Sequence, residues 1–147
     1  MIDELGDLYQ QLILDHNRSP RNRGRLEDAS RHAEGFNPLC GDRISLDLKL
    51  DGDVVAEARF EGAGCAISVS SASMMTEAIK GRPVEEVEEE FRRFHDLVTG
   101  EGDAEGTGKL RVFAGVREFP DRVKCAILGW HAMRSALTQD GAAVTTE

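Results

Sequence analysis

Three cysteines and one aspartate are the residues of this chain whose types and spacing could do chemistry: Cys40, Asp42, Cys65 and Cys125. Two of the cysteines lie in segments with Gly and Pro residues, which form tight loops. Three thiols and one carboxylate provide four anionic ligands, the number that a tetrahedral zinc ion needs. The cysteines lie tens of residues apart, too far for a zinc finger, so the tertiary fold would have to assemble the site.

The alternatives for each thiol are a nucleophile or a small buried apolar group. Free cysteine is among the most buried residue types, so burial is the commoner fate of one cysteine considered alone. Three cysteines, two of them in Gly-bearing loops and one beside Asp42, favour a common site. No Ser, His and Asp arrangement accompanies the serines of residues 68–73, so a serine nucleophile is not expected.

A hairpin is predicted to bring Cys40, Asp42 and Cys65 together. Residues 44–50 alternate apolar and polar, Asp51-Gly52 is a strong turn signal, and residues 54–60 form the return strand with Ala56, Ala58 and Phe60 on one face. Antiparallel pairing across that turn would place Glu61 opposite Asp42. Cys65 would then return to the end of the sheet at which Cys40 lies.

Helices are predicted on both sides of this hairpin in the sequence. Apolar residues at helical spacing indicate a first helix that ends near Asn17, followed by an irregular, basic connection over residues 18–36. Further helices are expected over residues 66–80, capped by Gly81, from Pro83 to Val98, and from Pro120 to Leu137. Residues 100–108 indicate a solvated glycine loop, and residues 110–116 a helical turn or two. The fold class is therefore α+β: a small antiparallel sheet of two or three strands covered by helices.

The last cysteine is expected near the start of the final helix. A helix N-terminus stabilises a thiolate, and Arg122 and Lys124 would add positive charge nearby. The histidines His16, His95 and His131 are interpreted as structural residues.

Composition limits the function classes. The chain has 147 residues and a formal net charge of −9, which favours a single domain over residues 1–147, with a frayed tail from about residue 139. This charge argues against binding to nucleic acid or to an anionic membrane and fits protein partners. No signal peptide or membrane-spanning run is visible, and the cysteine count is odd, so reduced thiols and a cytoplasmic location are expected.

Three motifs in order carry a resemblance that covers nearly the whole chain: Cys40-Gly41-Asp42, Gly64-Cys65-Ala66 before a serine-rich helix, and Lys124-Cys125-Ala126-Ile127-Leu128. With the segment Ser19-Pro20-Arg21-Asn22, they resemble the IscU/NifU N-terminal family of iron–sulfur cluster assembly. The chain is more similar to the SufU branch than to IscU. Lys124 stands where IscU scaffolds carry a histidine, the stretch between Cys65 and Cys125 is longer, and the Leu-Pro-Pro-Val-Lys segment is absent.

The resemblance to SufU implies a zinc ion held by Cys40, Asp42, Cys65 and Cys125. It also implies transfer of persulfide sulfur from a PLP-dependent cysteine desulfurase, with Cys40 as acceptor, to downstream iron–sulfur assembly proteins. Arg122 and Lys124 would offset the anionic ligands or contact the desulfurase. An alternative is a scaffold or carrier for a [2Fe–2S] cluster on the same ligands, since thiolates bind both zinc and clusters. A third possibility is a closed structural zinc site in an interaction domain.

Overall fold

The computed structural model describes residues 4–102, 108–138 and 144–145. Its elements, in chain order, are α1 (Glu4–Arg18), β1 (Arg31–Asn37), β2 (Asp42–Asp51), β3 (Val54–Ala63), α2 (Ala66–Ile79), α3 (Val84–Thr99), the 3₁₀ helix η1 (Gly108–Glu118), α4 (Pro120–Leu137) and β4 (Val144–Thr145). The α+β prediction is confirmed. Within the described residues, no helix is both long and apolar enough to cross a membrane.

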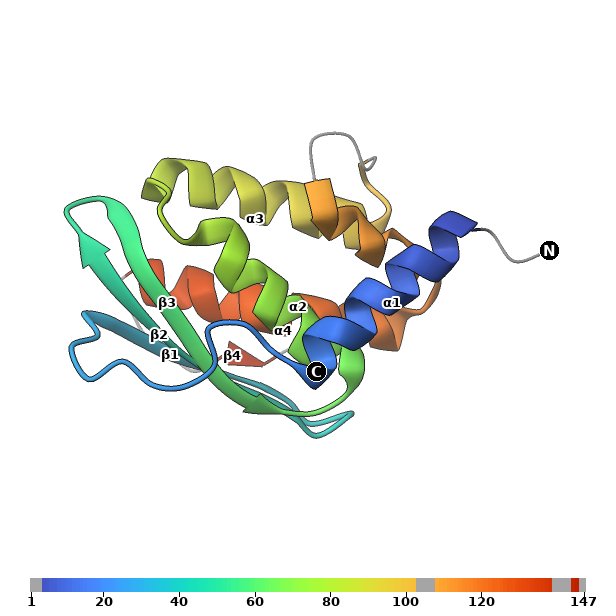
Figure 1. The fold of residues 1–147 in the computed structure, drawn as a ribbon, viewed down its shortest axis with the longest axis horizontal. Helices are drawn as coiled ribbons and strands as arrows, with labels where there is room; N and C mark the ends of the chain where they lie inside the picture. The colour runs from blue at the N-terminus through green and yellow to red at the C-terminus, as the bar shows by residue number, and fades with distance from the viewer. Residues whose placement is uncertain (1–3, 103–107, 139–143, 146–147) are drawn as a thin grey trace.

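The sheet lies on one side of the molecule and the helices on the other (Figure 1). Its strand order is β3-β2-β1-β4; β1, β2 and β3 pair antiparallel, and the short β4 runs parallel to β1. Helix α4 packs on β1 and β2, α2 packs on β3, and α3 lies farther from the sheet (Figure 1). The apolar side chains of β2 point toward the helices, and Ile44, Leu46 and Leu48 are fully buried.

The prediction of an irregular connection over residues 18–36 is wrong for its last part, because β1 begins at Arg31. The inward residues of β1 are Ala33, Gly35 and Asn37, so the strand shows none of the apolar alternation that marks a strand in a sequence. Small residues are needed there because α4 lies close. A Cβ atom on Gly35 would lie 3.0 Å from Leu128 Cδ1.

The predicted hairpin exists, but its register differs from the prediction. Asp51 pairs with Val54, so the turn residues are Gly52 and Asp53. The pairing shifts by one residue at a β-bulge between Lys49 and Leu50, because Lys49 pairs with Glu57 and Leu50 with Val55. Glu61 therefore pairs with Ser45 and not with Asp42. The bulge reverses the face of the residues next to it, so Val55 is buried and Ala56 only half-buried.

The serines of α2 connect this helix to its neighbours. Ser71 donates a hydrogen bond to Ala126 O (2.6 Å) and accepts one from Trp130 Nε1 (3.2 Å). Ser73 Oγ lies 2.7 Å from His16 Nδ1, which gives that buried histidine a structural role. Small side chains also allow close helix packing, since a Cβ on Gly129 would lie 3.3 Å from Ala72 Cβ. The low helix propensity of the serines is thus offset by tertiary hydrogen bonds.

Most predicted helix limits agree with the structure. Helix α1 ends at Arg18, α4 has the predicted bounds, and Gly81 (φ +83°) follows the end of α2. The predicted helical turn over residues 110–116 is part of η1. Residues 103–107 of the predicted glycine loop, and residues 139–143 and 146–147 of the predicted tail, lie outside the described residues. Val144 and Thr145 of that tail form β4 beside Gly35 and Phe36.

Candidate metal centre

The four residues singled out in the sequence lie at one end of the sheet. Cys40 lies in the turn between β1 and β2, Asp42 is the first residue of β2, Cys65 precedes α2, and Cys125 lies in α4. The ligand atoms of Cys40, Asp42 and Cys125 all lie within 4.8 Å of one another. These three could therefore hold one metal ion.

Cys65 borders this group of three ligands. Its backbone N–H donates to Asp42 Oδ1 (2.9 Å), while its sulfur accepts a hydrogen bond from Ser68 N (3.4 Å) as the N-cap of α2. The Cys65 sulfur also lies near the Cys125 thiol, whose pKa it helps to raise, and a thiolate can accept an N–H hydrogen bond while it ligates a metal. The thiol at a helix N-terminus is thus that of Cys65.

Cys125 lies in the second turn of α4, close to the expected position near the start of that helix. Its sulfur lies 3.4 Å from Asp121 O and 3.7 Å from Cys40 Sγ. Burial raises the pKa of the Cys125 thiol well above its ordinary value, and the neighbouring Asp42 carboxylate and Cys65 sulfur add to the shift. A helix N-terminus would have lowered this pKa; in this fold burial and anionic neighbours prevail.

The ligands differ sharply in exposure. Asp42 and Cys125 are fully buried, Cys65 is half-buried, and Cys40 is exposed. Three sulfurs and a carboxylate cannot all be ionised side by side without a cation. The group therefore has the composition of a metal site, with one ligand open to solvent.

Two glycines shape the loops of the site. Gly41 has a φ of +74°, in the left-handed region, and its N–H donates to Asn37 O (2.8 Å), which closes the turn that carries Cys40. Gly64, with a φ of +150°, lies against Asp42, where an added Cβ would come within 3.0 Å of Asp42 Cα. A side chain at residue 64 would separate Cys65 from Asp42.

Arg122 and Lys124, the two basic residues predicted to act at the site, differ in how they lie relative to the thiols. The Coulomb attraction of Cys65 raises the pKa of Arg122, and Cys125 and Cys40 contribute further, so this exposed guanidinium faces the thiols. Lys124 is half-buried and, among the described residues, makes no hydrogen bond or ion pair with a residue of the site. The geometry therefore favours Arg122 alone as the cation beside the thiols.

Asn37 belongs to the site and was missed as a functional residue in the sequence. It is fully buried, and its side-chain amide contacts Asp42 Oδ2 (3.3 Å) and Cys125 Sγ (3.7 Å). Asn37 pairs with Asp42 where β1 meets β2. A sequence signal existed, since Asn37-Pro38 opens the loop of Cys40, but this dipeptide ordinarily indicates only a turn.

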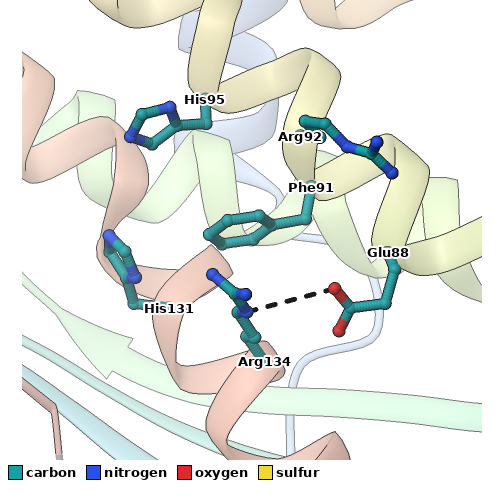
Figure 2. Close-up of a pocket in the computed structure, with 6 residues that line it drawn as sticks. All are labelled: Glu88, Phe91, Arg92, His95, His131 and Arg134. Atoms are coloured by element: carbon teal, nitrogen blue, oxygen red, sulfur yellow. Dashed lines mark ion pairs between the residues drawn. The ribbon is translucent and has the colours of Figure 1, made fainter.

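A second group of polar side chains lies between α3 and α4, around a pocket of about 270 Å³ (Figure 2). Its residues interact mainly with one another. Arg134 lies 5.0 Å from the centre of the Phe91 ring and pairs with Glu88 (4.0 Å), and His131 meets the same ring edge-on at 5.4 Å. Burial, with help from His95 and Arg134, lowers the pKa of His131. This pocket has the character of a packing contact, as predicted for His131.

His95 also forms a group with Asp96 and Glu101 whose ligand atoms lie within 4.8 Å of one another. Glu101 is exposed and the other two are half-exposed, which is common for acidic groups without a metal. No thiol accompanies them, so this group lacks the chemistry of the cysteine site.

Comparison with known proteins agrees with the site. Residues 8–126 match the NifU-like N-terminal domain family. The zinc-dependent sulfurtransferase SufU of Bacillus subtilis is 46% identical over 92% of this chain and 93% of its own length. The iron–sulfur cluster assembly scaffold protein IscU of Thermotoga maritima is 42% identical over 88% of this chain and 92% of its own length.

Solved structures agree with this result. A SufU from Fervidobacterium islandicum AW-1, described as a candidate iron–sulfur cluster assembly scaffold for the SUF system, superposes with a TM-score of 0.83 at 34% identity. That match covers 86% of this chain and 94% of the other. The family model spans most of the chain and the relatives align over nearly their full length. This chain is a member of the NifU-like N-terminal domain family.

Proposed function

We propose that this protein is a zinc-dependent sulfur acceptor of iron–sulfur cluster assembly, which receives persulfide sulfur from a cysteine desulfurase. One observation carries the proposal: Cys40 is exposed, while Asp42 and Cys125, which share its ligand group, are fully buried. A purely structural zinc site would not need an accessible thiol among its ligands, whereas a sulfur acceptor does. The similarity to the zinc-dependent SufU of Bacillus subtilis supports the same function.

The ligands of the proposed zinc ion are Cys40, Asp42, Cys65 and Cys125. The ligand atoms of Cys40, Asp42 and Cys125, which lie within 4.8 Å of one another, support a cation at this position, and the buried Cys125 thiol, whose pKa burial raises, would ionise at neutral pH only with that cation beside it. Bound zinc would hold its thiol ligands as thiolates. Arg122 adds a positive charge at the solvent side of the thiols.

The proposed transfer is a thiolate–persulfide exchange at Cys40. The Cys40 thiolate attacks the terminal sulfur of the donor persulfide, and a new S–S bond forms while the S–S bond of the donor breaks. The donor cysteine leaves as a thiolate and Cys40 becomes the persulfide, so charge and atoms balance without a redox reagent. Exposure of Cys40 gives the attacking sulfur the access that this step requires.

The surface near the thiols suits a protein partner. Leu39, beside Cys40, is 58% exposed, and Phe119, at the start of α4, is 59% exposed. A groove of about 850 Å³ is lined by residues of α1, α2, η1 and the start of α4, among them Ile67, Phe119 and Arg122. Large exposed apolar side chains are typical of interaction surfaces. The partner that we propose here is a PLP-dependent cysteine desulfurase, with downstream assembly proteins as recipients of the sulfur.

A second candidate function is a scaffold for a [2Fe–2S] cluster. The similarity to the scaffold protein IscU of Thermotoga maritima favours it, and the thiol ligands suit a cluster as well as zinc. The two functions differ in what the purified protein contains and in what it does.

The test is anaerobic purification without added metal, followed by measurement of metal content, visible absorbance and stimulation of a partner desulfurase. We expect one zinc per chain, no cluster absorbance, and stimulation that Cys40→Ala abolishes. A protein with cluster absorbance that passes its cluster to an apo-acceptor would instead establish the scaffold function.

A further inference from the structure

We infer that Asn37 is a positioning residue of the metal centre, whose side-chain NH₂ group holds Asp42 and Cys125 in place by donating one hydrogen bond to each. The inference rests on the proposed metal-binding function and adds a residue outside the ligand set.

The hydrogen bonds of Asn37 fix the orientation of its amide. Nδ2 lies 3.3 Å from Asp42 Oδ2 and 3.7 Å from Cys125 Sγ, and Oδ1 accepts from Leu39 N at 3.3 Å. A flipped amide would direct its oxygen at a carboxylate oxygen and its NH₂ group at a backbone N–H. Only the present orientation satisfies all three partners.

Charge explains why an amide suits this position. Asp42 and Cys125 are both fully buried, and as metal ligands they would be a carboxylate and a thiolate. A neutral NH₂ group can donate to both at once without competing with the metal for the ligands as a cation would. The second oxygen of Asp42 accepts from Cys65 N, so the buried carboxylate is fixed on both sides.

Asn37 also helps to shape the turn that carries Cys40, through its Oδ1 and through its main-chain oxygen, which accepts from Gly41 N. A purely turn-shaping role must therefore be separated from the positioning role. Asn37→Asp separates them, because an aspartate oxygen can still accept from Leu39 N, while the NH₂ group is replaced by an oxygen that repels Asp42 and Cys125. Asn37→Ala removes both functions.

The test is the dissociation constant for Cd²⁺, measured by competition with a chelator and followed by the thiolate-to-cadmium absorbance band. Residues that orient metal ligands typically change affinity about 10- to 100-fold, so Asn37→Ala should weaken binding by that factor. Asn37→Asp should weaken it further and shift the band. Wild-type affinity in Asn37→Asp, or a smaller loss than in Asn37→Ala, would overturn the inference.

Thr76→Val is the matched control for lost stability. Thr76 is fully buried and accepts a hydrogen bond from Asn22 on the α2 side of the molecule, so its loss should lower the melting temperature and leave the Cd²⁺ affinity unchanged. A drop in affinity in Thr76→Val equal to that in Asn37→Ala would mean that general destabilisation explains both, and the inference would fail.

A second measurement needs no variant to fold. In Cd²⁺-loaded wild-type protein, the two side-chain amide protons of Asn37 should exchange slowly with solvent in NMR spectra; fast exchange would contradict the inference. The readouts are independent of sulfur transfer. A wild-type protein that binds Cd²⁺ as expected but accepts no sulfur would refute the proposed function and leave the role of Asn37 standing.

Discussion

The two ends of α4 carry polar groups in opposite arrangements. Near its start, Cys125 lies among a carboxylate and two other thiols, groups that share the tendency to become anions. Near its end, Arg134 faces Glu88 and an aromatic ring, so opposite charges and a π surface satisfy one another (Figure 2). The comparison teaches that a cluster of like ligands, which can all ionise together only with an added cation, marks a functional site better than a cluster of complementary groups does.

The largest effect is expected from a buried ligand. Cys125→Ser should lower zinc affinity by more than about 100-fold, beyond the range typical of residues that only orient ligands. The reason is that Cys125 is fully buried within the ligand group. Zinc competition with a chromophoric chelator measures this. Wild-type zinc affinity in Cys125→Ser would show that Cys125, like Arg134 near the other end of α4, is not needed for metal binding.

Removal of the metal should rank second. A ligand present at about 30 times its dissociation constant stabilises the folded state by about 2 kcal/mol, so chelation should lower the melting temperature by several degrees. Differential scanning calorimetry with and without chelator measures the change, and Cys125→Ser serves as the control that should not respond. An unchanged transition in the wild-type protein would argue against a metal in this site.

The comparison of Arg122 with Lys124 should show a smaller effect. Arg122 faces the thiols, whereas Lys124 makes no polar contact with the site among the residues that the structure describes. Arg122→Ala should therefore slow sulfur transfer about 5-fold and Lys124→Ala about 2-fold at most, by the Coulomb energies of exposed pairs. Transfer rates at low and high salt measure this, since screening should reduce the Arg122 effect. An equal loss of transfer rate in both variants would show that only the net charge near the thiols matters, not the position of Arg122.

At the far end of α4, Arg134→Ala should cost only about 1 kcal/mol in the free energy of unfolding, the size of one cation–π contact with a weak ion pair. Zinc affinity and sulfur transfer should stay at wild-type values. Urea denaturation and the same transfer assay provide the two measurements. A loss of transfer with unchanged stability would show that the pocket in Figure 2 takes part in function.

The smallest effect should come from pH at this same end. Burial lowers the pKa of His131 below its ordinary value of 6.5, so the folded state disfavours protonation. The stability that neutral His131 contributes is complete above about pH 6.5 and is lost as the pH falls through the folded-state pKa. His131→Gln should therefore flatten the fall in melting temperature between pH 7.5 and pH 5. Because the pKa of buried His16 is lowered in the same direction, a residual slope should remain.

The sequence was sufficient to predict most of the helices from their periodicity and to single out Cys40, Asp42 and Cys125, which the structure brings together; whether Cys65 is the fourth ligand stays a prediction. The sequence did not predict the features that depend on tertiary packing. Strand β1 has Ala33 and Gly35 facing inward because α4 lies close, and no local pattern reveals that. The β-bulge that buries Val55 depends on strand pairing. The role of Asn37 depends on Cys125, a residue far away in the chain.

The separation of 88 residues between Asn37 and Cys125 also bears on how the protein is made. During synthesis the chain emerges from its N-terminal side, so the sheet and the turn of Cys40 can form long before α4 is available. Contacts between distant segments close late because loop closure costs entropy. The ligand group of Cys40, Asp42 and Cys125 is therefore complete only after α4 has docked on the sheet, so a metal that needs all three ligands would bind the folded chain and not its N-terminal part alone.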